Sequence, residues 1–146
     1  MATVSVYLNF RDSCEAAFEH YRQVFGGEFD GGLIHRFGDM PPQEGCPPLD
    51  PALAKLVMHV SLPILGGVRL MGSDAPEGLC GPFQEGSSVH INLQPDTRAE
   101  ADRLFAALSA GGQVTMAMAE QFWGAYFGSF TDRFGIRWMI NCEAKS

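Results

Sequence analysis

The sequence predicts an α+β fold in which two tandem βαβββ modules form an eight-stranded, curled, mixed sheet around a concave pocket. Two pairs of similar segments support this prediction. Residues 67–71 (GVRLM) resemble residues 135–139 (GIRWM) at an offset of 68 (139 − 71), and residues 7–10 (YLNF) resemble residues 90–93 (HINL) at an offset of 83 (90 − 7). Landmarks that recur in one order along a chain indicate a duplicated structural unit.

A third likeness lies between those segments and predicts one helix in each module. Asp12 and Thr97 are separated by 85 residues (97 − 12), and each precedes an apolar-periodic segment that ends in a Gly-Gly pair. Glu15 and Glu100 follow three residues later, at the spacing of a reciprocal capping box, and glycine favours a left-handed helix stop. The predicted helices cover residues 13–25 and 98–110.

Alternation of apolar and polar side chains predicts the strands, because successive side chains of a strand point to opposite faces of its sheet. The predicted strands cover residues 4–10, 28–37, 55–62, 67–73, 88–93, 113–118, 125–131 and 136–142. Five of the nine prolines fall in residues 39–53, which predicts a long loop there. The modules then span residues 3–74 and 87–143, with a connector at 75–86, within a single domain of residues 1–146.

Composition restricts the class of protein. The formal net charge of −7 argues against nucleic acid as a partner, since phosphate binding requires clustered basic residues. No apolar segment approaches the roughly 20 residues that span a bilayer, and the N-terminus lacks a basic and then apolar leader. We therefore expect a cytoplasmic protein without a membrane partner. The four cysteines are far apart and are expected to be free thiols: Cys14, Cys46, Cys80 and Cys142.

The side chains that point away from the predicted helices are candidates for the pocket. In the first strand of the second module, Val89, Ile91 and Leu93 are expected beneath the helix, which directs His90 and Asn92 to the pocket. The same alternation in the other strands selects the remaining candidate ligand-binding residues, and one aromatic residue is placed at the pocket mouth. Its members are Tyr7, Asn9, His59, His90, Asn92, Trp123, Met139 and Asn141.

Two C-terminal segments carry a resemblance to a known family. Residues 120–124 (EQFWG) and 131–141 (TDRFGIRWMIN) resemble the PhnB-like subfamily of the vicinal oxygen chelate superfamily. That superfamily includes glyoxalase I, extradiol dioxygenases, and the fosfomycin and bleomycin resistance proteins. His59 and residues 72–74 (GSD) also fit the subfamily, and the likeness covers nearly the whole chain. It implies the glyoxalase/bleomycin resistance fold and a twofold-symmetric homodimer.

The resemblance also implies where a divalent metal would be bound. The metal enzymes of the superfamily take ligands from the first and last strands of each module, which correspond here to Tyr7, Met71, His90 and Met139. Thioethers suit Cu(I) rather than Zn, Ni or Fe(II), and a catalytic zinc needs about three N, O or S⁻ ligands. We therefore predict no cofactor and no metal at these positions. A divalent metal held by another set, such as His59, His90 and Glu120, stays possible.

Two functions remain open from the sequence. The first is a protein that binds or sequesters a small organic ligand, as drug-binding members of the superfamily do without a metal. The second is a glyoxalase-like or dioxygenase-like enzyme, a lyase, isomerase or oxygenase, with a rearranged metal site or with His90 as a general base. His20 and His35 receive no role in either hypothesis. Exposed sheet edges also favour pairing with a second copy of the chain.

Overall fold

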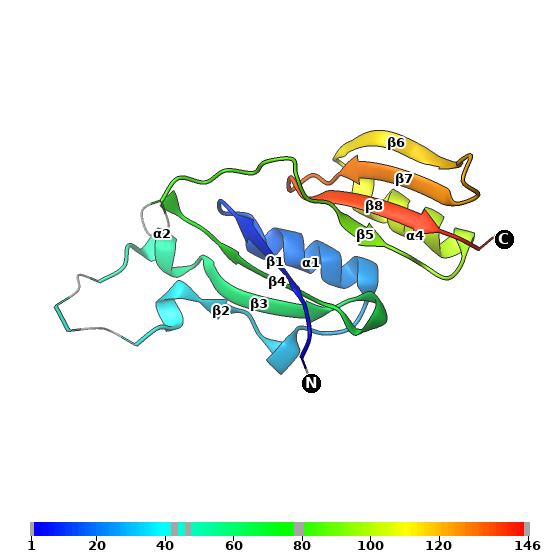
Figure 1. The fold of residues 1–146 in the computed structure, drawn as a ribbon. Helices are drawn as coiled ribbons and strands as arrows, with labels where there is room; N and C mark the ends of the chain where they lie inside the picture. The colour runs from blue at the N-terminus through cyan, green and yellow to red at the C-terminus, as the bar shows by residue number, and fades with distance from the viewer. Residues whose placement is uncertain (1, 42–43, 46–47, 78–80, 145–146) are drawn as a thin grey trace. The chain divides into compact units, whose positions relative to one another are not determined.

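The structure is a computed structural model that describes residues 2–41, 44–45, 48–77 and 81–144. The chain divides into two compact units, residues 1–83 and 84–146. Each unit contains a strand, then a long helix, then three further strands (Figure 1). The predicted pair of βαβββ modules is therefore confirmed.

The first unit contains one mixed sheet and one long helix. Helix α1 covers Cys14–Phe25. The sheet has the strand order β1-β4-β3-β2, with β1 parallel to β4 and the other neighbours antiparallel. Its strands are β1 (Val6–Phe10), β2 (His35–Arg36), β3 (Val57–Pro63) and β4 (Arg69–Asp74). Short helical segments complete the unit: η1 (Asp30–Gly32), η2 (Phe37–Asp39), α2 (Pro51–Ala54) and η3 (Leu65–Gly67).

The second unit repeats this topology with shorter connections. Helix α4 covers Arg98–Ser109. The strand order is β5-β8-β7-β6, with β5 parallel to β8 and the others antiparallel. Its strands are β5 (Ile91–Leu93), β6 (Gln113–Glu120), β7 (Tyr126–Thr131) and β8 (Arg137–Cys142). The structure thus has two mixed four-stranded sheets where we expected one of eight strands, and the predicted curl of a joined sheet stays a prediction.

The strand register corrects the alignment of the two modules. Tyr7 lies opposite Met71 on the neighbouring parallel strand, and Asn92 lies opposite Met139 in the same way. Tyr7 therefore corresponds to Asn92, at an offset of 85 (92 − 7), and not to His90. A slip of two residues keeps every apolar side chain on its face, so the sequence pattern could not reveal this error.

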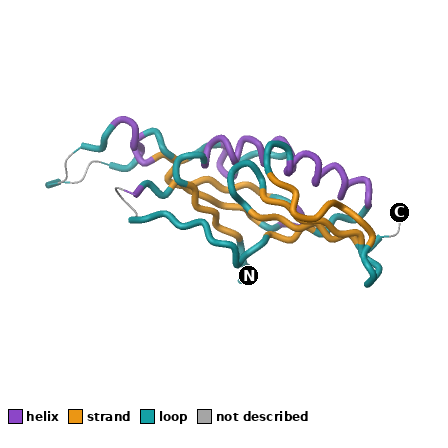
Figure 2. The backbone as a smooth tube through the Cα atoms, turned by 90° about the horizontal axis from the view of Figure 1, so that it is seen from above, coloured by secondary structure: helices purple, strands orange, loops and turns teal. Residues whose placement is uncertain are grey.

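Helix α1 packs on β3 and β4 and forms the core of the first unit. Figure 2 shows the long helices, in purple, running beside the strands, in orange. The helix lies close to the sheet at Gly72, where an added Cβ would lie 2.6 Å from Cε2 of Phe18. The residues below 2% exposure in this core are Phe10, Cys14, Ala17, Phe18, Tyr21, Val57, Val60, Leu62 and Leu70.

Helix α4 forms the corresponding core in the second unit. Phe105 meets Phe130 of β7 edge to face, with ring centroids 5.1 Å apart. Gly128 lets this layer pack, because a Cβ there would lie 2.9 Å from the Phe105 ring and 2.6 Å from the Met118 sulfur. The residues with no exposed surface in this core are Ala101, Leu104, Leu108, Trp138, Ile140 and Cys142.

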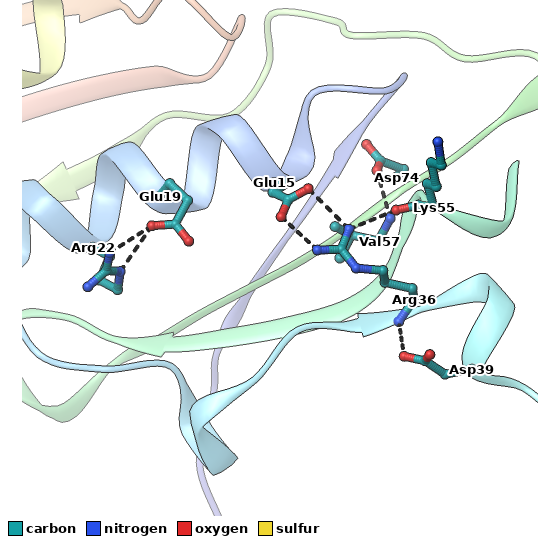
Figure 3. A network of polar contacts seen from close by, with 8 residues as sticks. All are labelled: Glu15, Glu19, Arg22, Arg36, Asp39, Lys55, Val57 and Asp74. Atoms are coloured by element: carbon teal, nitrogen blue, oxygen red, sulfur yellow. Dashed lines mark hydrogen bonds and ion pairs between the residues drawn. The ribbon is translucent and has the colours of Figure 1, made fainter. Parts of the chain in front are cut away.

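The N-termini of the two long helices are satisfied in different ways. The Thr97 hydroxyl accepts a hydrogen bond from Glu100 N at 3.1 Å, as predicted. The capping role predicted for Asp12 is wrong, because the residue at the N-cap of α1 is Ser13 and it makes no side-chain capping bond. Instead the buried Asp74 carboxylate at the end of β4 accepts from Cys14 N at 3.0 Å and from Val57 N at 2.9 Å. Figure 3 shows the bond from Val57 N.

Residues 28–37 do not form the long strand that we predicted. Strand β2 contains two residues, and η1 precedes it. Arg36 holds this segment in place: its guanidinium donates to Glu15 of α1 at 2.7 and 3.0 Å and to Lys55 O at 2.8 Å (Figure 3). Side-chain bonds to neighbouring elements thus replace the ladder of a regular strand.

Two further predictions are corrected by the structure. Strand β5 begins at Ile91, so Val89 is not beneath the helix but 73% exposed. The end of the predicted loop 39–53 enters α2, where Pro51 occupies the first turn and Asp50 accepts a capping bond from Ala52 N at 2.8 Å. Pro42, Pro47, Cys46 and Cys80 lie outside the described residues. No helix among the described residues is long and apolar enough to cross a membrane.

Candidate functional site

Each unit has one sheet face that its long helix does not cover, here called the open face. In β4 the exposed or half-buried Arg69, Met71 and Ser73 alternate with buried residues, and β8 repeats this alternation with Arg137, Met139 and Asn141. These half-buried side chains lie on the open faces, because alternate residues of a strand share a face. The predicted division of β4 and β8 between two faces is confirmed.

On the open face of the first unit, Tyr7 and His59 form a contacting pair. The Tyr7 hydroxyl lies 3.3 Å from Nδ1 of His59, and the two rings are stacked with centroids 5.8 Å apart. Asn9 lies beside Ser73, whose hydroxyl donates to the Asn9 amide oxygen at 3.4 Å. Three residues of the predicted set, Tyr7, Asn9 and His59, are therefore placed on one sheet face.

An ion pair occupies another part of the same face. Asp30 accepts hydrogen bonds from Arg69 Nε at 2.8 Å and from the Ser61 hydroxyl. The bond from Arg69, followed by the bond from Ser61, lowers the pKa of the Asp30 carboxyl below its ordinary value. Asp30 is thus ionised and already paired with Arg69, while the exposed Tyr7 and the half-buried His59 contribute polar rings to this face.

On the open face of the second unit, polar and soft side chains lie together. Register places Ser129 opposite Met139 and Phe127 opposite Asn141. The Ser129 hydroxyl is 2.7 Å from the Thr115 hydroxyl of β6. Asn92, exposed on β5, is the register partner of Met139. Three residues of the predicted set, Asn92, Met139 and Asn141, thus lie on the adjoining strands β5 and β8, and their role in ligand binding stays a prediction.

Aromatic side chains border this second face. Trp123 lies in the turn between β6 and β7 and meets Phe127 edge to face at 5.9 Å. Its other aromatic neighbour is Phe122, at 5.1 Å. Phe122 is 97% exposed and Trp123 is 54% exposed. An exposed aromatic pair beside a polar sheet face is available to stack on a planar molecule.

The two open faces carry the same pair of residue types at their centres and different residues beside it. Ser61 lies opposite Met71 in the first unit, and Ser129 lies opposite Met139 in the second. Two residues before each serine stand His59 and Phe127. The duplicated serine–methionine pair therefore presents the same hydroxyl and thioether twice, while the flanking rings give the two faces different chemistry.

His90 does not lie in a strand. It is exposed and precedes β5, and among the described residues it has no hydrogen bond or ion pair. Glu120, an alternative ligand considered from the sequence, pairs with Arg98 at 3.3 Å. Within the described part of the chain no three His, Cys, Asp or Glu residues are grouped closely enough to hold a metal ion.

Sequence reasoning missed the structural carboxylate of Asp132. Asp132 begins the turn between the strands predicted at 125–131 and 136–142, in which Gly135 has a φ of 92°. Asp132 is 3% exposed and accepts bonds from Phe134 N (2.9 Å), Ile136 N (3.0 Å) and Trp138 Nε1 (2.9 Å). The turn was visible in the sequence, whereas the bond to a buried indole depends on the β7–β8 register.

The comparisons with known proteins agree with this fold. Residues 4–140 match the Glyoxalase/Bleomycin resistance protein/Dioxygenase superfamily. The chain belongs to this superfamily. It is also similar to protein YjdN of Escherichia coli strain K12, with 32% identity over 145 residues, which cover 94% of this chain and 93% of that protein.

Two solved structures extend the comparison. Protein PA1353 of Pseudomonas aeruginosa has a TM-score of 0.81 and 38% identity, with 98% of both chains covered. A PhnB protein from Bacillus cereus, described as a putative 3-demethylubiquinone-9 3-methyltransferase, has a TM-score of 0.70 and 20% identity over 97% of this chain and 99% of that one. At that identity the second likeness supports the fold alone. These relatives are consistent with the PhnB-like subfamily of the superfamily.

Proposed function

We propose that this superfamily member binds a small organic ligand on the open faces of its sheets without the divalent metal of the metal-dependent members. The observation that carries the proposal is the register of the first and last strands. It pairs Tyr7 with Met71 and Asn92 with Met139, which makes Asn92, and not His90, the counterpart of Tyr7 among the four strand positions that supply metal ligands in the superfamily's metal enzymes. None of the side chains at these four positions is a carboxylate or an imidazole, and thioethers are poor ligands for Zn, Ni or Fe(II).

The chemistry of the second face supports an organic ligand with a planar group. Trp123 and Phe127 provide aromatic surface, and the polarisable sulfur of Met139 adapts to varied shapes. Asn92 and Asn141 supply amide donors and acceptors next to that surface. A site with apolar walls and a few polar groups is the usual composition of a small-molecule site.

The dye 8-anilinonaphthalene-1-sulfonate tests this proposal, because its ring system suits the aromatic surface and its fluorescence reports binding. We expect saturable binding in buffer that contains EDTA. Trp123→Ala and Met139→Ala should each weaken it about tenfold, a value typical of losing a central contact residue. Gln23→Ala, on an exposed position of α1, is the matched control and should bind as the wild type does.

Bleomycin and fosfomycin, added as competitors, then examine two ligand chemistries found within the superfamily. Dye binding that requires a divalent metal would contradict the proposal. So would binding that is equally strong in the Trp123→Ala, Met139→Ala and control variants. Near-UV circular dichroism of each variant verifies that the dye reports a folded protein.

The enzymatic alternative depends on His90, and no contact among the described residues favours it. A general base must reach the proton that it removes, usually through a group that orients it. His90 is exposed and no orienting bond to it is found among those residues. If His90→Ala abolished a stoichiometric metal bound by protein purified without added ions, the enzymatic alternative would replace the proposal.

A further inference from the structure

We propose that His35 and His59 form a two-histidine site for a divalent transition metal, Cu²⁺ foremost, on the open face of the first unit. The two residues are direct register partners across the antiparallel pair of β2 and β3. Their ring centroids are 6.5 Å apart and the ring planes differ by 30°. Neither of the two proposed ligands, His35 and His59, occupies any of the four strand positions that supply metal ligands in the superfamily's metal enzymes.

The cross-strand geometry places both imidazoles on the same side of the sheet. Residues directly opposite each other on antiparallel strands point to one face, with Cβ atoms about 4.5 to 5.5 Å apart. His35 is exposed and His59 is half-buried, so an ion in solution can reach both rings. Two imidazoles held in this way act as a chelate, because the second nitrogen is already present at high effective concentration.

The observed ring separation is close to what one ion requires. A metal lies about 2.0 to 2.1 Å from an imidazole nitrogen, and therefore roughly 3.2 Å from the ring centre. Two rings on one ion then have centroids roughly 4.5 to 6.4 Å apart, for angles at the metal between about 90° and 180°. The 6.5 Å separation closes into this range by rotation about χ2 of the exposed His35, a torsion with a broad energy well.

Tyr7 supplies the outer-shell contact that such a ligand needs. Its hydroxyl lies 3.3 Å from Nδ1 of His59. A phenol oxygen can accept a hydrogen bond from Nδ1–H, which leaves Nε2 with a free lone pair for the metal. Bonds of this kind orient a ligating histidine and fix its tautomer. Tyr7 is thus a positioning residue for the site.

The donor set favours Cu²⁺. Among first-row divalent ions, affinity for nitrogen ligands rises to a maximum at Cu²⁺, which also accepts a geometry completed by water. Among the described residues no carboxylate forms a group of three with this pair, and Asp30, on the same face, is held by Arg69 and Ser61. Two protein ligands and bound water make a copper- or nickel-binding site rather than a catalytic zinc centre, which needs about three protein ligands.

Isothermal titration of the untagged full-length chain with Cu²⁺, and separately with Ni²⁺, tests the proposal. We expect one ion per chain, with Cu²⁺ bound more tightly than Ni²⁺. His35→Ala and His59→Ala should each lower the Cu²⁺ affinity at least about tenfold, because a single imidazole has lost its chelating partner. Tyr7→Phe should lower it about tenfold while leaving the stoichiometry at one, as removal of an outer-shell bond does.

His20→Gln, on helix α1, is the matched control and should retain the affinity of the wild type. NMR provides an independent readout: substoichiometric Cu²⁺ should broaden the imidazole signals of His35 and His59 together, before those of the other two histidines. Circular dichroism establishes that each variant is folded. Unchanged affinity in both His35→Ala and His59→Ala, or first broadening at His20 or His90, would overturn the proposal.

Discussion

At the scale of single residues, two buried carboxylates connect the elements of this fold. Asp74 bridges the first residue of α1 and the first residue of β3, and Asp132 joins the β7–β8 turn to the indole of Trp138. Both carboxylates are buried and accept backbone N–H bonds, which is the arrangement that makes a buried polar group tolerable. Their function is structural, although acidic residues near strand ends also suit catalysis.

Asp74 makes the stability of the protein depend on pH. Burial raises the pKa of its carboxyl above the ordinary value, against the opposing effect of the two backbone bonds. A raised folded-state pKa means that the native protein holds the proton more tightly than the unfolded chain does. The favourable contribution of this carboxyl to stability is complete below its pKa in the unfolded chain, about 3.9. It is lost as pH rises through its pKa in the folded protein.

We therefore expect the unfolding free energy of the wild type, minus that of Asp74→Asn, to decrease as pH rises from about 4 through the folded-state pKa of Asp74. Urea unfolding of both proteins across a pH series measures it. The exposed Asp96→Asn is the matched control and should show no such trend. If the wild-type free energy minus that of Asp74→Asn increased with pH, the two backbone bonds would have a larger effect on the pKa of Asp74 than burial has.

At the scale of elements, the helix–sheet spacing in the first unit depends on Gly72. A Cβ at this position would lie 2.6 Å from the Phe18 ring and 3.1 Å from Leu8 O. We predict that Gly72→Ala lowers the unfolding free energy by about 1 to 3 kcal/mol, as overpacking does. Chemical denaturation measures this loss.

The double variant Gly72→Ala with Phe18→Leu checks the cause of that loss. If the clash with the ring is responsible, the double variant should lose less than the sum of the two single losses, since the substitutions are in direct contact. Strict additivity would instead assign the loss to backbone strain at β4. Gly81→Ala is unsuitable as a control, because Gly81 has φ +81° and would add strain of its own.

Element types were more predictable than their contacts. The helix at 98–110 was predicted within one residue at its C-terminus, because Thr97, Glu100 and the apolar period are all local signals. The segment 28–37 was mispredicted as one strand: its buried Phe29, at 8% exposure, lies outside β2, which contains only His35–Arg36. The bonds of Arg36 to α1 and to Lys55 O, which hold this segment, join residues about 20 positions apart and have no local signature.

At the scale of the whole molecule, we predict a twofold-symmetric homodimer. Strand β6 is an edge of its sheet, and its eight residues are all exposed or half-buried. Val114 and Met116 on this strand are 48% and 46% exposed. An edge of this length with apolar side chains is a template for pairing with another chain, and a stable dimer would bury at least about 1,000 Å².

Light scattering at micromolar concentration measures the assembly. A dimer would have a mass of 31.8 kDa, twice the 15.9 kDa of one chain. Met116→Lys, which places a charge on the edge, should shift the mass toward that of the monomer if β6 forms the interface. A wild-type mass near 15.9 kDa would exclude the dimer, and an unchanged dimer in the variant would exclude β6 as its contact.

The sequence by itself determined the duplicated βαβββ plan, the two long helices and the faces of the main strands. Each of these depends on periodicities of about two or four residues, or on a repeat of the same residues, all of which are visible along one chain. It also predicted the superfamily and the poor metal ligands at Met71 and Met139, because residue type alone decides coordination chemistry.

Tertiary structure alone decided which residues meet. It set the strand register, which makes Tyr7 and Asn92 equivalent positions of the two modules and leaves His90 outside β5. It brought Asp74 to the start of α1, 60 residues earlier in the chain, and it placed His35 opposite His59. A slip of two residues leaves an alternating pattern unchanged, and long-range bonds leave no periodic trace. Packing between elements is the physical cause that selects one register and one set of partners.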